Sequence, residues 1–171
     1  MKQHLAILIF IFSSINAMNQ NNLNTSLGEF VNLDRNPSNQ TFTFKTDNGI
    51  AAVTIFTPNI FRIRIAKKFG TDHSFAVVGK PVRGNFDYGE DKTSFFISTD
   101  SLLLEVNKKP LRLTFKTKDG QVINQDDHNF GTSWIGTEVT AYKVMQEGEK
   151  FIGLGEKTGN LDRRGEAYEH W

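Results

Sequence analysis

The stretch FIGLGEKTGNLDRRGEAYEHW, at residues 151–171, gathers the side chains that are best placed to do chemistry. Carboxylates and cations alternate there with the aromatic rings of Tyr168 and Trp171. Such a mixture suits a sugar, because aromatic faces can meet C–H groups while carboxylates and guanidinium groups hydrogen-bond hydroxyls. The simpler interpretation is a solvated loop whose local ion pairs contribute less than about 1 kcal/mol each.

The same stretch contains GLGEKTG, which invites comparison with a phosphate-binding loop. That loop requires glycine directly before Lys-Ser/Thr, so that backbone amides can surround the phosphate. Here Glu156 precedes Lys157, and its carboxylate would repel a phosphate. A dinucleotide site is also unsupported, since no helix pattern follows the glycines. We therefore expect no nucleotide cofactor.

Metal and nucleophile chemistry find little support elsewhere in the chain. The sequence has no cysteine, and its four histidines show no spacing typical of zinc ligands: His4, His73, His128 and His170. Asp126-Asp127-His128 could bind a cation or act as acid and base, but a solvated turn is the favoured interpretation. Ser74 lies outside any nucleophile-elbow pattern. No catalytic residue, metal or cofactor is predicted.

Size and charge narrow the class of protein. A chain of 171 residues, 38% hydrophobic and 23% charged, has room for one globular domain. Its net charge of +1 gives no reason to expect nucleic acid or an acidic membrane as a partner.

The N-terminus has the layout of a secretory signal peptide. Lys2 precedes an apolar run, and small or polar residues follow as far as Ala17. The run is shorter than the ~20 residues that span a bilayer. We therefore predict a signal peptide at residues 1–17 and a secreted or periplasmic mature protein. Residues 18–40 are rich in asparagine and are expected to form a flexible leader and a first strand.

From residue 41 onward, apolar and polar residues alternate with a period of two, which is typical of strands. In IFRIRIA, Phe61, Ile63 and Ile65 are expected to face inward while the two arginines face outward. TFTFKT and LRLTFKT follow the same pattern, and IAAVTIF is apolar on both faces, as in a buried strand. Turn signals separate these runs, and no window shows a helical period.

The alternation predicts an all-β fold over residues 41–155. Short strands with one apolar face must bury it against a second sheet, so we expect an antiparallel β-sandwich, with a closed barrel as the alternative. QDDHNFGTSWIGT has no period and is expected to be a long surface loop. Gly153 and Gly155 are expected where a strand leaves the sheet with close backbone approach.

The terminal motif is specific enough to indicate a family. Gly153-Leu154-Gly155-Glu156, then Leu161-Asp162-Arg163-Arg164-Gly165 and the final Trp171, resemble the end of the N-terminal domain of glycoside hydrolase family 31, the α-glucosidase and α-xylosidase group. IFRIRIA and LEVNKKPLRLTFKTKDGQVI also look like that domain. The resemblance covers residues 28–171.

This resemblance implies a galactose-mutarotase-like sandwich, of supersandwich type, followed by a (β/α)₈ barrel that acts on α-linked oligosaccharides or glycosides. Retention of configuration requires two carboxyl groups ~5 Å apart. In the family both are aspartates of the barrel, which this chain lacks. Residues 156–171 would then be a loop that leads toward the missing barrel. Tyr168, Glu169 and Trp171 are its candidate sugar contacts, while Glu156, Asp162, Arg163 and Arg164 would fix the loop against the barrel.

Three functional hypotheses remain open at this point. The chain is the N-terminal part of a secreted α-glycosidase and is inert alone, or it is a free-standing carbohydrate-binding module. The third is a mutarotase-type enzyme, which would need His73 or His128 beside a carboxylate on the sandwich. The first is favoured, because the terminal motif is its strongest support.

Overall fold

The computed structural model describes residues 24–153, 155–156 and 158–169, and this part of the chain is built almost entirely from antiparallel strands. Its one helix is a short 3₁₀ turn, η1 (Pro37–Asn39). The described ranges include no helix with the length and hydropathy of a membrane span. The predicted signal peptide lies outside the described residues.

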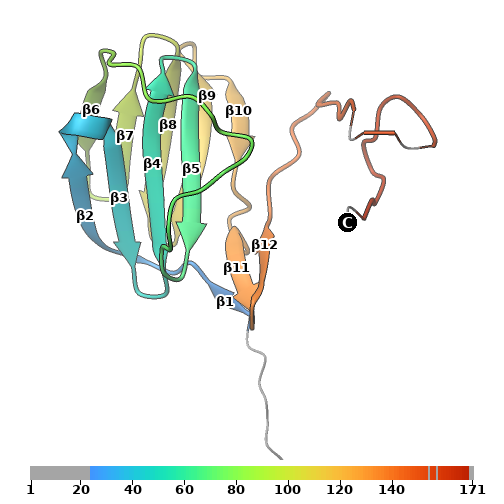
Figure 1. The fold of residues 1–171 in the computed structure, drawn as a ribbon, viewed down its shortest axis with the longest axis horizontal. Coiled ribbons are helices and arrows are strands. Elements are labelled where there is room, and N and C mark those ends of the chain that lie inside the picture. Colours follow the sequence, from blue (N-terminus) through green and yellow to red (C-terminus); the bar gives the residue numbers. More distant parts are fainter. Residues whose placement is uncertain (1–23, 154, 157, 170–171) are drawn as a thin grey trace, which may run out of the picture.

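Two main sheets lie one in front of the other (Figure 1). The first has the order β2-β3-β4-β5, with β2 (Phe30–Asn36), β3 (Thr41–Thr46), β4 (Ile50–Thr57) and β5 (Ile60–Ala66). The second has the order β10-β9-β8-β7-β6, with β6 (Asp87–Glu90), β7 (Ser94–Ser98), β8 (Leu102–Lys108), β9 (Leu111–Thr117) and β10 (Val122–Gln125). The sandwich prediction is confirmed.

The core fills the space between the two sheets. Phe42 and Phe44 of β3 face inward as the alternation predicts, and Phe44 packs on Phe95 of β7 with ring centroids 5.3 Å apart. Buried aliphatic side chains complete this layer: Val53, Ile55, Ile97, Leu104, Val106, Leu111 and Leu113. Phe61, Ile63 and Ile65 pack against it from β5, as expected.

A third, small sheet joins β1 (Thr25–Ser26), β11 (Thr132–Ile135) and β12 (Glu138–Ala141) in the order β1-β11-β12. The prediction of a long surface loop over residues 125–137 is therefore wrong for β11. Trp134 of that strand is only 6% exposed and belongs to the core. Trp134 alone anchors this strand in the core, and a single apolar residue gives no alternating pattern from which a strand could be predicted.

The loop between β5 and β6 crosses the outer face of the first sheet (Figure 1). Arg62 donates to both carboxylate oxygens of Asp72, at 2.8 and 2.7 Å, and this holds the pKa of Asp72 below its ordinary value. The end of the loop is fixed by Gln40, whose side-chain nitrogen donates to Ile55 and Val82 carbonyls at 3.1 and 3.0 Å. Its side-chain oxygen accepts the Gly84 amide at 2.9 Å.

Gln40→Ala should lower the free energy of unfolding by about 1–3 kcal/mol, because it leaves buried backbone groups without their hydrogen bonds. Urea denaturation of the two proteins measures this difference. Ser38→Ala, at an exposed position of the same 3₁₀ turn, is the matched control and should change stability by less than about 0.5 kcal/mol. Equal effects of the two substitutions would show that Gln40 does not anchor the loop.

Candidate functional site

The part of the chain that carries the candidate sugar contacts begins where β12 ends. Residues 142–144 run beside the end of β10: the Val144 amide donates to the Gln125 carbonyl at 2.8 Å, and the Asp127 amide donates to the Tyr142 carbonyl at 2.9 Å. Residues 145–169, called the terminal segment here, then extend away from both sheets and form a small loop of their own (Figure 1).

Asp126 fixes the root of the terminal segment. Its carboxylate accepts the Leu113 amide of β9 at 2.8 Å and pairs with Lys143 at 2.6 Å. The expectation of a solvated turn is therefore wrong for this residue, whose side chain is only 5% exposed. The reason is that Asp126 directly follows β10 and forms an isolated antiparallel bridge with Lys143, whose ammonium group meets its second oxygen.

Asp162 closes the loop of the terminal segment. Its side-chain oxygen accepts the Phe151 and Arg164 amides, both at 3.1 Å, and the Arg163 amide donates to the Phe151 carbonyl at 2.8 Å. These backbone hydrogen bonds, supported by the charges of Lys150 and Arg164, lower the pKa of Asp162 below its ordinary value of 3.8.

Arg163 holds Tyr168, one of the predicted sugar contacts. Arg163 is 8% exposed and donates through one terminal nitrogen to the Thr158 carbonyl at 2.8 Å and to the Tyr168 hydroxyl at 3.2 Å. Its guanidinium carbon also lies 5.5 Å from the centre of the Tyr168 ring. Glu169 follows and is exposed, whereas Trp171 lies outside the described residues. The structure thus shows how Tyr168 is held, but it does not show whether Tyr168, Glu169 and Trp171 lie together.

Of the remaining charged residues in this motif, Arg164 hydrogen-bonds to the chain itself. Arg164 donates to the Gln146 and Glu149 carbonyls at 3.0 and 2.5 Å, and Glu156 is exposed. The expectation of close backbone approach at Gly153 and Gly155 is wrong, because a Cβ at either position would meet no atom of the described residues within 4 Å. Both glycines have positive φ, of 106° and 77°, so they serve backbone conformation instead.

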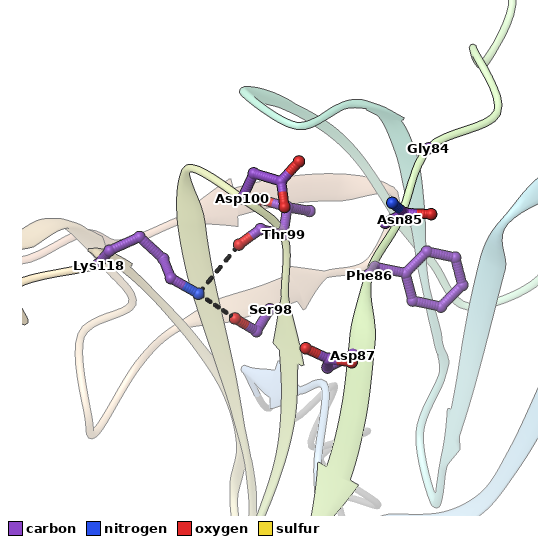
Figure 2. A pocket seen from close by; sticks show the side chains of 8 residues that line it. All are labelled: Gly84, Asn85, Phe86, Asp87, Ser98, Thr99, Asp100 and Lys118. Carbon is purple, nitrogen blue, oxygen red and sulfur yellow. Dashed lines mark hydrogen bonds between the residues drawn. The ribbon is translucent and has the colours of Figure 1, made fainter.

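A polar cleft of about 580 Å³ opens at one end of the second sheet and was not predicted from the sequence (Figure 2). Lys118 reaches across it and donates to the Ser98 hydroxyl at 2.6 Å and the Thr99 carbonyl at 3.0 Å. Asp87 and Asp100 also line it. Its residues belong to two turns and the start of β6, so no single stretch of sequence indicated it.

The two histidines of the mutarotase-type hypothesis lie in different loops. His73 contacts Phe75, with ring centroids 4.6 Å apart. His128 lines a hollow of about 300 Å³ together with Glu105 and Asp126, but these carboxylates already pair with Lys116 and Lys143. Among the described residues, no three Asp, Glu or His side chains are grouped to hold a metal ion.

Comparison with known proteins gives a consistent result. A family model described as "Glycosyl hydrolase 31 N-terminal galactose mutarotase-like domain" matches residues 50–171. Alpha-glucosidase 2 of Bacillus thermoamyloliquefaciens is 29% identical over 133 residues, which make up 76% of this chain and 17% of that protein.

Solved structures agree with this match. A Flavobacterium johnsoniae GH31 dextranase, complexed with glucose, has a TM-score of 0.79 and 27% identity over 86% of this chain and 19% of its own. A cycloalternan-forming enzyme from Listeria monocytogenes has a TM-score of 0.66 at 15% identity, covering 85% of this chain and 15% of its own, and shows the fold alone.

The chain therefore spans less than a fifth of the length of these relatives. Its family model covers most of its residues, and its strands build the sandwich that the family description names. From the match and the fold together, the chain belongs to the family of glycosyl hydrolase 31 N-terminal galactose mutarotase-like domains.

Proposed function

We propose that this chain is the N-terminal, non-catalytic β-sandwich of an exported retaining α-glycosidase that acts on α-linked oligosaccharides or glycosides. The catalytic (β/α)₈ barrel would follow in the same polypeptide, and the sandwich would support it and shape its substrate entrance. One observation carries the proposal: the chain belongs to an N-terminal domain family and spans 17% of a matching α-glucosidase.

Exposed apolar side chains near the end of the chain support a docking role. Five large apolar residues between positions 144 and 161 are between 39% and 76% exposed: Val144, Met145, Phe151, Ile152 and Leu161. Apolar side chains that gather into a contiguous exposed patch are typical of an interface. The occupant that we propose is the barrel, because the terminal segment already extends away from the sheets toward the end of the chain.

The shape of the terminal segment suits a role at a substrate entrance. Arg163 holds the Tyr168 hydroxyl, so the ring is fixed before any sugar arrives, and a preset contact costs less ordering on binding. Tyr168, Glu169 and Trp171 would line the entrance. Export would follow from the signal peptide that the sequence of residues 1–17 predicts, which gives a secreted or periplasmic protein.

Acid should disorder the terminal segment. The lowered pKa of Asp162 means that its ionised form stabilises the loop above pH 3.8, and that this stability is lost as the pH falls through the lowered value. Amide chemical shifts of Phe151 and Arg164 should therefore titrate below pH 3.8. In Asp162→Asn this titration should vanish, whereas Asp34→Asn, on β2, should preserve it. A titration that persists in Asp162→Asn would contradict the assignment.

The 171-residue chain should self-associate through the terminal segment, because surface that would meet the barrel is uncovered. Ile152→Ser with Leu161→Ser should lower the average mass that light scattering measures. Phe75→Ser with Val78→Ser, at exposed apolar positions of the β5–β6 loop, is the matched control and should leave it unchanged. A longer polypeptide that includes the barrel should be monodisperse. Equal association of the chain and the longer polypeptide would count against docking.

The chain alone should not hydrolyse p-nitrophenyl α-glucoside, because no pair of carboxyl groups has been assigned to catalysis in it. The coding DNA beyond the Trp171 codon should continue in frame for several hundred codons and encode a barrel with two catalytic aspartates. Expression of that longer polypeptide should produce the activity. Turnover by the chain alone, abolished by an active-site label, would refute the proposal, as would a stop codon directly after Trp171.

A further inference from the structure

The outer face of the second sheet carries a row of side chains that does not belong to the core. Cross-strand pairing aligns Phe96 of β7 with Glu105 of β8, Glu105 with Thr114 of β9, and Thr114 with Gln125 of β10. All four are half-buried, and Phe96 lies between the core residues Phe95 and Ile97, so it faces outward. Strands lie about 4.8 Å apart, so the row is roughly 14 Å long.

One side of the Phe96 ring has room for a ligand. Its neighbour on β6 is Gly89, where an added Cβ would meet no atom within 4 Å. The next row adds a second apolar side chain, since Leu103 pairs with Ser98 on one side and Lys116 on the other. Phe96 and Leu103 therefore form an apolar centre on an otherwise polar face.

A preformed hollow lies at one end of this row. It has a volume of about 300 Å³ and is lined by Glu105, Thr114 and Gln125 of the row, with His128 among the remaining residues. Buried Arg112 fixes its wall by donating to the Asp127, His128 and Asn129 carbonyls at 2.9, 3.1 and 3.0 Å. The hollow thus has a rigid floor of three strands and a loop that is held in place.

The polar cleft of Figure 2 is lined by Asp87 and Ser98, which pair across β6 and β7 of the same sheet. Ser98 lines this cleft and Lys116 lines the hollow. Leu103 pairs with both of them and lies between them. The backbones of these two lining residues are therefore about two strand spacings, or roughly 10 Å, apart. The apolar centre lies between them.

The charges on this face compensate one another. Lys116 pairs with Glu105 at 2.7 Å, Asp126 pairs with Lys143 at 2.6 Å, and the Arg112 guanidinium is occupied by carbonyl oxygens. Such a face gives no advantage to a strongly charged ligand. It offers hydroxyl, amide and carboxylate groups beside an aromatic ring, which together can bind both the O–H and the C–H groups of a ligand.

From this arrangement we infer that the outer face of the second sheet binds a neutral oligosaccharide, at a place other than the candidate sugar contacts of the terminal segment. The oligosaccharide would lie across the strands, with one sugar ring on Phe96 and another, further along, in the hollow beside Thr114 and Gln125. The choice of α-linked glucose units as the ligand rests on the proposed function. The site would hold substrate near the enzyme without taking part in cleavage.

The inference can be tested by titrating the isotope-labelled 171-residue chain with isomaltotriose and with maltotriose and following its amide chemical shifts. Saturable chemical-shift changes are expected at the amides of Phe96, Glu105 and Thr114. Phe96→Ala should weaken binding roughly fivefold or more, because it removes the ring on which the sugar would stack. Phe75→Ala, at an exposed aromatic of the β5–β6 loop, is the matched control and should bind as tightly as the unchanged chain.

Thr114→Val keeps the shape of the side chain and removes only its hydroxyl, so it tests the site without disturbing the fold. It should also weaken binding while the remaining amide spectrum stays the same. Absence of saturable shifts on this face with either sugar, or equal weakening by Phe75→Ala and Phe96→Ala, would overturn the inference. Neither result touches the proposed function, which fails instead if the longer polypeptide lacks glycosidase activity.

Discussion

The structure depends on one apolar layer shared by two antiparallel sheets. Phe42 and Phe44 on one side meet Phe95 and Ile97 on the other, and the Phe44 and Phe95 rings contact directly. Truncating a buried phenylalanine to alanine typically costs about 3–5 kcal/mol, a large share of a domain's stability. Because this layer uses one face of most of the main strands for the core, their opposite faces lie on the outside of the sandwich.

Buried polar side chains connect the loops and the terminal segment to that layer. Gln40 fixes the loop over the first sheet, Arg112 fixes the loop after β10, and Asp126 ties the root of the terminal segment to β9. Each anchor is buried and bonds mainly to backbone groups, so each determines where a segment lies. The terminal segment itself is organised by Asp162 and Arg163, which gives it a defined shape without help from a large core of its own.

The apolar pattern was sufficient to predict β3, β4, β5 and β9, because side chains on a pleated strand point to opposite faces with a period of two, but it did not indicate β6 or β10. It could not predict β11, whose place depends on the single residue Trp134. It also gave no indication of the cleft beside Lys118, since Asp87, Ser98 and Lys118 meet only after the strands pair. Asp126 was misread because a carboxylate in a run of polar residues looks solvated until its partner, Lys143, is known.

The family assignment was predictable from the motif at residues 151–171, whereas the packing that gives the motif its shape was not. We propose that this sandwich docks against a catalytic barrel in a longer polypeptide. Hydrogen exchange of the terminal segment, compared between the 171-residue chain and a longer polypeptide that includes the barrel, tests it most directly. The account predicts strongly slowed exchange around Ile152 and Leu161 in the longer polypeptide. Equal exchange in the two proteins would contradict it.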